Sequence, residues 1–164
     1  MKAITPLVKG IITGVLMVLC ALLLYYTNVQ AGSIVHYTIY LIFFLGILWT
    51  LIAHTKTSAY TGSFGNLFNQ GFRCFIITIL IMVAFTSIFN LMHPEFAENA
   101  AEAYRADLIK EGGKLPKEID ELVSKAKKQY NTGVVYFTIF GYLVIGAIFT
   151  ALASVIIMAI TPRK

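Results

Sequence analysis

The chain has 164 residues, of which 58% are hydrophobic and 13% are charged, and its mean hydropathy is +0.77. These values lie outside the range of ordinary soluble domains and indicate a membrane protein. The net charge of +5 comes from Lys and Arg residues that form no basic face, which argues against nucleic-acid binding.

Four apolar runs are each long enough for a helix to cross about 30 Å of hydrocarbon. They cover residues 7–26, 35–53, 72–92 and 133–160. The runs are continuously apolar, whereas a strand of a membrane barrel would alternate apolar and polar residues. The sequence therefore predicts an all-α fold, a bundle of four transmembrane helices in a single domain of residues 1–164, with the lipid bilayer as its surroundings.

The first run has a clear helix start, with Thr5 as N-cap and Pro6 at the first helical position. Gly10 and Gly14 follow at a spacing of four, which lets another helix backbone approach closely. The pair serves packing within the chain's own bundle or a homodimer equally well. Residues 28–33 are uncharged and predict a turn that makes the first two runs an antiparallel hairpin.

Between the second and third runs, residues 54–70 are rich in Thr, Ser, Gly and Asn and predict a linker. Phe64, Phe68 and Phe72 recur at helical spacing near its end. We therefore expect a short interfacial helix that leads into the third span.

The region between the third and fourth runs carries the charge. Residues 93–131 contain all eight Asp and Glu residues and seven of the thirteen Lys and Arg residues. Pro94 and Glu95 predict the start of one helix, Gly112 its end, and Pro116 the start of a second helix. The sequence thus predicts an extramembrane amphipathic helical hairpin here.

Each predicted hairpin helix has an apolar stripe. The stripes are Phe96, Ala100, Tyr104 and Leu108 on the first helix and Ile119, Leu122, Val123, Ala126 and Tyr130 on the second. They can pack on each other, on the membrane surface or on a partner protein. As candidate docking residues we take Phe96, Tyr104, Leu108, Ile119, Leu122 and Tyr130.

The last run has small residues on two adjacent lines, which favours close helix packing. One line is Gly146, Thr150 and Ser154, and the next is Ala147, Ala151, Val155 and Ala159. At 28 residues the run is longer than a bilayer requires, so we expect it to tilt, protrude or break near Gly141 or Gly146.

Signs of catalytic chemistry are absent from the sequence. No Asp, Glu, Lys or Arg lies in the middle of a run, and no known catalytic or phosphate-binding motif is present. His36 and His93, with Glu95, could hold zinc only if the fold brought them together, and two isolated histidines specify no coordination geometry. We expect no metal, no cofactor and no enzymatic activity.

Positive residues flank the runs on one side of the predicted membrane. Lys2 and Lys9 precede or begin the first run, and the turn after it is uncharged. Because positive residues favour the cytoplasm, we expect both termini to be cytoplasmic and the hairpin to lie on the other side.

Several short motifs resemble domain-of-unknown-function family 4199. They are Ser63-Phe64, Phe68 and Gly71-Phe72 before the third run, His93-Pro94-Glu95-Phe96 after it, Gly112-Gly113, Lys127-Lys128, and the small residues of the last run. The resemblance implies a bacterial four-span protein of a Gram-negative inner membrane. It implies no activity, cofactor or catalytic residue.

Two functions are compatible with these features. The first is a non-catalytic accessory or scaffold subunit of a larger inner-membrane complex, which docks a membrane-protein partner through the hairpin. The alternative is a small oligomeric transporter or channel for an apolar or weakly polar solute.

Overall fold

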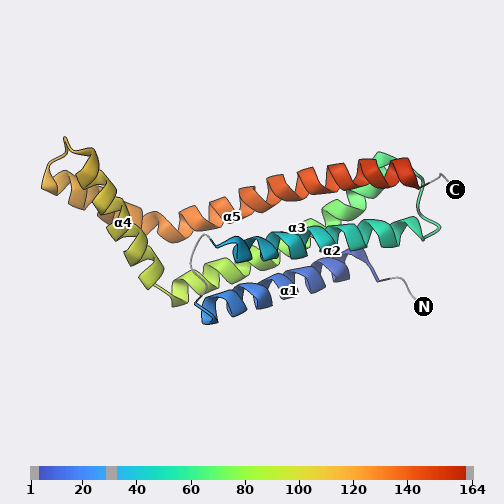
Figure 1. The fold of residues 1–164 in the computed structure, drawn as a ribbon, viewed down its shortest axis with the longest axis horizontal. Helices are drawn as coiled ribbons and strands as arrows, with labels where there is room; N and C mark the ends of the chain where they lie inside the picture. The colour runs from blue at the N-terminus through green and yellow to red at the C-terminus, as the bar shows by residue number, and fades with distance from the viewer. Residues whose placement is uncertain (1–3, 29–32, 162–164) are drawn as a thin grey trace. The chain divides into compact units, whose positions relative to one another are not determined.

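The computed structural model describes residues 4–28 and 33–161, and within these ranges it contains helices but no strand. In chain order the helices are α1 Pro6–Tyr26, a 3₁₀ turn η1 Ile34–His36, α2 Tyr37–Thr55, α3 Phe64–Met92, α4 Glu95–Glu111 and α5 Pro116–Ile160 (Figure 1). Four segments are long and apolar enough to cross a membrane: α1, η1 with α2, α3, and α5. The predicted all-α class is confirmed, with four helices among the described residues that are apolar enough to span a membrane.

Local signals set most helix ends where the sequence predicted them. Thr5 caps α1, since its hydroxyl accepts a hydrogen bond from the Val8 amide at 3.4 Å. Helix α4 begins directly after Pro94 and ends at Gly112, whose φ of 69° suits glycine. Helix α5 begins at Pro116.

The predicted linker is shorter than expected, covering residues 56–63, and the separate interfacial helix predicted before the third span is wrong. Helix α3 begins at Phe64 and continues without interruption to Met92. Ser63 explains the early start, because its hydroxyl accepts a hydrogen bond from the Asn66 amide at 3.3 Å in the position of a helix cap. The aromatic residues Phe64, Phe68 and Phe72 therefore belong to the third span's own helix.

Helix α5 likewise joins two elements that were predicted separately. It is a single helix of 45 residues that includes both the second hairpin helix and the last apolar run, without a break at Gly141 or Gly146. At about 1.5 Å per residue it is roughly 68 Å long, about twice the thickness of the hydrocarbon layer. No proline follows Pro116 until the helix has ended, and an isolated glycine costs a helix only about 1 kcal/mol.

The chain forms two compact units. One consists of Met1–Met82 with Ile139–Lys164, and the other of Val83–Thr138. In the first unit α1 and α2 are neighbouring antiparallel helices (Figure 1). The predicted turn between them falls largely on residues 29–32, which lie outside the described residues.

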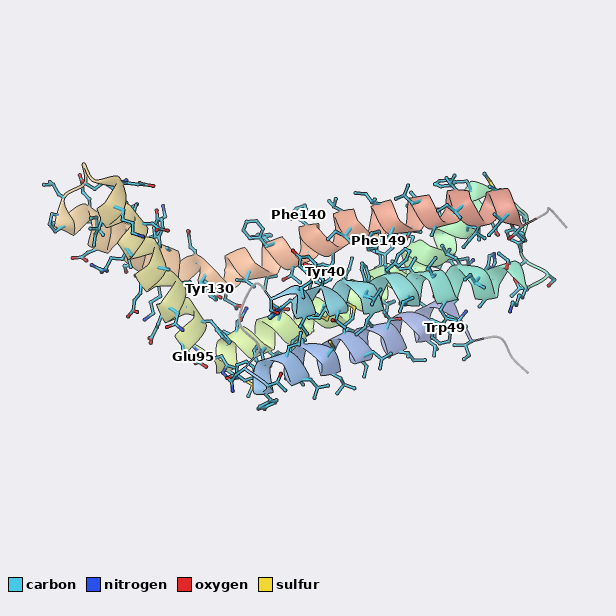
Figure 2. The ribbon with its side chains drawn as sticks, viewed as in Figure 1. Tyr40, Trp49, Glu95, Tyr130, Phe140 and Phe149 are labelled. Carbon is cyan, nitrogen blue, oxygen red and sulfur yellow. The ribbon has the colours of Figure 1, made fainter. Side chains whose placement is uncertain are left out.

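The first unit is a four-helix bundle with an apolar core. Its fully buried side chains include Met17, Phe43, Ile47, Leu51, Leu67 and Phe75. Helix α3 is tied to α1 by a hydrogen bond from the Thr78 hydroxyl to the Gly10 carbonyl at 3.1 Å. On the other side, the rings of Phe44 and Phe149 join α2 to α5 with centroids 4.9 Å apart; Figure 2 labels Phe149.

Candidate functional site

The second unit contains a helical hairpin with its own small core. Helix α4 and the first part of α5 bury four apolar side chains against one another: Ala101, Leu108, Ile119 and Val123. Leu108 is 4% exposed and Ile119 is 8% exposed. These two candidate docking residues are therefore held inside the hairpin and are not available to a partner.

The stripe on α4 follows a different line from the predicted one. Ala100 is exposed and the neighbouring Ala101 is buried. A repeat of four residues drifts around a helix of 3.6 residues per turn, whereas Ala101 and Leu108, seven residues apart, stay on one face. This is why the regular spacing of four in the sequence misplaced the buried face.

Two ion pairs link the hairpin helices. Arg105 Nη1 lies 2.6 Å from Asp120 Oδ1, and Lys127 Nζ lies 2.8 Å from Glu98 Oε1. All four side chains are partly solvent-exposed, so each pair contributes at most about 1 kcal/mol. Because the two pairs lie at different points along the helices, together they favour one register of the hairpin.

The outer face of the hairpin keeps apolar residues exposed. Tyr104 is 40% exposed and Leu122 is 36% exposed, and Ile109 and Leu115 are more exposed still. The other two candidate docking residues, Phe96 and Tyr130, are half-buried; Figure 2 labels Tyr130 on α5. The docking candidates thus separate into a buried pair, a half-buried pair and an exposed pair.

A compact cluster surrounds the start of α4. His93 Nδ1 lies 2.6 Å from Glu95 Oε1, and the His93 ring is 4.4 Å from the Phe89 ring. The pKa of Glu95 is lowered, first by a hydrogen bond from its own backbone amide and then by the hydrogen bond from His93. An ionised Glu95 also favours the positive end of the helix dipole.

The two histidines considered as zinc ligands, His36 and His93, make hydrogen bonds in different units of the chain. His36 Nδ1 lies 3.3 Å from the Ser33 carbonyl in the first unit, while His93 pairs with Glu95 in the second. Across residues 4–28 and 33–161, no group of three potential metal ligands is found.

The predicted packing glycines lie at close helix contacts within the first unit. A Cβ atom on Gly14 would come within 2.8 Å of Ile81, and one on Gly146 would come within 3.0 Å of Phe75. A Cβ on Gly10 would meet the Cys74 carbonyl oxygen at 2.5 Å. Helix α3 of the same chain therefore occupies the face that Gly10 and Gly14 present.

Two further glycines make contacts of this kind that the sequence analysis missed. A Cβ on Gly46 would collide with the Thr13 side chain, and one on Gly71 would collide with Thr150. Each is an isolated glycine inside an apolar helix, which is a signal of close packing only when its neighbour is known.

The buried face of the last span follows one predicted line and departs from the other. Gly146, Thr150 and Ser154 are buried, and Ala147 and Ala151 are half-buried. Val155 and Ala159 are exposed, and Ala153 and Ile157 are buried in their place. The face continues through spacings of three and four residues, as a straight helix requires.

A cavity that the sequence did not predict lies where α1 begins and α2 ends. Its volume is about 420 Å³, and Lys9, Trp49 and His54 are among its lining residues. All of its lining residues belong to the first unit. Figure 2 labels Trp49 on α2, toward the end where α1 begins. Lys9, near the start of α1, is only 6% exposed.

Comparison with known proteins bears on the family alone. No curated protein and no solved structure matches the chain. The model of the family described as "Protein of unknown function (DUF4199)" matches residues 9–159, which includes the four apolar spans almost completely and the whole hairpin. The chain therefore belongs to the DUF4199 family of proteins of unknown function.

Proposed function

We propose that this protein is a non-catalytic accessory or scaffold subunit of a larger complex in a bacterial inner membrane. In this proposal both termini are cytoplasmic and the hairpin lies in water on the opposite side. Its four apolar helices are the membrane anchor, and the hairpin is the surface that docks a membrane-protein partner.

The observation that carries the proposal is the division of the hairpin into an inner and an outer face. Leu108 and Ile119 hold the two helices together, so the hairpin needs no partner to keep its shape. Tyr104 and Leu122 nevertheless remain exposed on the outside. Amphipathic side chains such as Tyr are favoured in protein interfaces, and a held conformation reduces the entropy that is lost on binding.

Length supports the same proposal. Two adjacent spans can be joined by a few residues, yet here 17 residues form α4 and the first part of α5 extends the hairpin. The eight acidic residues, all in this region, also favour an aqueous location.

The test changes only the outer face. In the full-length protein, Tyr104→Ser with Leu122→Ser should reduce the amount of partner recovered after crosslinking and mild solubilisation of native membranes. The matched control is Ala103→Ser with Ser124→Ala, which alters two exposed positions on the same helices without removing a large side chain.

A stronger variant replaces residues 95–130 with a short Gly/Ser linker. If that protein still recovers every partner and complements a deletion strain, the docking proposal fails. Loss of membrane-surface contact without loss of a partner would identify lipid as what covers the outer face, and would also reject a protein-docking role.

The alternative, a small oligomeric transporter or channel, draws support from α5. The Thr150 and Ser154 hydroxyls are fully buried and have no hydrogen-bond partner among the described residues. Hydroxyls of this kind could form hydrogen bonds with water or with a weakly polar solute that passes between the helices. If so, vesicles that contain the protein should admit such a solute faster than empty vesicles, and Thr150→Val with Ser154→Ala should remove the difference.

A further inference from the structure

The cavity between the start of α1 and the end of α2 contains an unbalanced positive charge. Lys9 is only 6% exposed, although lysine is almost never buried without a partner. Its Nζ lies 5.4 Å from the centre of the Trp49 ring and makes no ion pair or hydrogen bond with any described residue. All eight acidic residues of the protein lie elsewhere, in residues 95–121.

Neither neighbour satisfies the Lys9 ammonium group. The Trp49 ring attracts a cation through its electron-rich face, and the carbonyl end of α2 carries a partial negative charge. Both effects favour a lysine at this point. Neither supplies a conventional acceptor to the three N–H groups, so these groups remain able to donate to a ligand in the cavity.

Other hydrogen-bond donors line the same cavity. The Thr5 hydroxyl accepts from the Val8 amide, so its own proton is free to be donated. Gln70 also lines the cavity, and its side chain carries an amide that can donate hydrogen bonds. Lys9, Thr5 and Gln70 together offer several donors to one space, which is the arrangement that binds an oxyanion.

His54 forms a fixed wall of the cavity. Asn66 Nδ2 donates to the Ala59 carbonyl at 3.2 Å, which orients the Asn66 amide so that its Oδ1 faces His54. His54 Nε2 therefore donates to Asn66 Oδ1, at 2.7 Å. The Nε2–H group of His54 is therefore already used, and it is not available to bind an anion in the cavity.

The rest of the lining is apolar and includes the Trp49 ring, Ile4, Pro6 and Ala53. A ligand with an anionic oxygen group beside an apolar part matches both kinds of wall. We propose that this cavity binds the phosphate group of an amphiphile, with Lys9 as the charged ligand-binding residue and Trp49 as the apolar wall. The shared chemistry, a phosphate oxyanion, belongs to an anionic lipid headgroup and to free phosphate alike.

Trp49 makes the test direct, because it is the only tryptophan in the chain. The full-length protein, purified in a non-ionic detergent, is titrated with short-chain phosphatidylglycerol, with diacylglycerol of the same chain length and with inorganic phosphate. We expect a saturable change in Trp49 emission with phosphatidylglycerol and none with diacylglycerol. A response to inorganic phosphate of equal affinity would identify free phosphate as the ligand, which also supports the proposal.

Variants separate Lys9 from general surface charge. Lys9→Met should weaken phosphatidylglycerol binding about tenfold or more, because a hydrogen bond to a charged group contributes about 1.5–3 kcal/mol. Gln70→Met, which removes a neutral donor, should weaken binding less. The matched control is Lys56→Met, which removes an exposed lysine just after α2 and should leave the affinity unchanged.

A second measurement protects against a change in the probe itself, since Lys9 contacts Trp49. The ligand should raise the thermal unfolding midpoint of the wild-type protein and of Lys56→Met, but not that of Lys9→Met. Three results would overturn the proposal: equal binding of diacylglycerol and phosphatidylglycerol, no saturable binding, or unchanged binding by Lys9→Met.

Discussion

Arg105 and Asp120 are 15 residues apart in the chain, yet their side chains meet at 2.6 Å between Nη1 and Oδ1. The pair joins α4 to the first part of α5 beside the buried Leu108 and Ile119. Exchanging the two charges tests whether the contact helps to set the register of the hairpin.

Arg105→Asp alone should place two carboxylates together and reduce hydrogen-exchange protection of the hairpin amides, by up to about 1 kcal/mol in opening free energy. The double variant Arg105→Asp with Asp120→Arg should recover most of that loss. A double variant as poorly protected as the single one would show that the pair contributes nothing to the register.

The hairpin core should be far more sensitive to truncation than its outer face. Leu108→Ala should reduce the opening free energy of the hairpin by about 2–4 kcal/mol, because it leaves a cavity among Ala101, Ile119 and Val123. Ile109→Ala, one residue later and exposed, should change it by less than about 0.5 kcal/mol. Hydrogen exchange measures both, and similar effects at the two positions would contradict the assigned faces.

Glycines at close helix contacts should differ from glycines with open surroundings. Gly46→Ala should lower stability by about 1–3 kcal/mol, because its Cβ would collide with Thr13. Gly141→Ala should raise stability by up to about 1 kcal/mol, since no atom lies near its Cβ and alanine is the better helix former. The thermal unfolding midpoint in detergent should fall for Gly46→Ala and rise for Gly141→Ala. A change in the same direction for both variants would contradict the packing of α1 on α2.

The start of α4 should depend on pH through Glu95. The pKa of Glu95 is lower in the folded protein than in the unfolded chain, so its contribution is complete above the usual carboxyl pKa of 4.5. That contribution is lost as the pH falls through the lower, folded-state pKa.

Nuclear magnetic resonance of the Glu95 carboxyl carbon measures this titration. His93→Phe keeps an aromatic ring beside Phe89 but removes the hydrogen-bond donor, so it should move the Glu95 pKa upward, part of the way to its usual value. An unchanged titration in that variant would show that the backbone hydrogen bond acts alone.

The orientation in the membrane is open to a direct measurement. In a protein with Cys20→Ala and Cys74→Ala, a cysteine at Ala103 should react with a membrane-impermeant thiol reagent in intact spheroplasts. A cysteine at Ser58 should react only after permeabilisation. Both positions are exposed in the structure, so burial would not explain a difference. The reverse pattern would overturn the proposed cytoplasmic termini.

Most of the helical architecture could be predicted from the sequence because its signals are local. Long apolar runs predict spans wherever they occur, and Thr5, Pro94, Gly112 and Pro116 act on the helix ends next to them. The two boundary errors arose where such signals are weak. Polar residues before Phe72 predict a linker, and Gly141 or Gly146 is one possible site of a break in the last run, although α3 and α5 continue through these residues as single helices.

The side on which each residue packs was decided by tertiary structure, because it depends on neighbours that are distant in sequence. Leu108 is buried and Tyr104 exposed on the same helix only because Ile119 and Val123 approach one face of α4. A side chain at Gly46 is disfavoured only because Thr13 of another helix lies against it. Lys9 resembles an ordinary membrane-flanking lysine in the sequence, and only the packing of α1 against α2 encloses it beside Trp49. Local sequence preferences determined where the helices of this protein form. Contacts between helices determined which helix faces are buried and where the cavity lies.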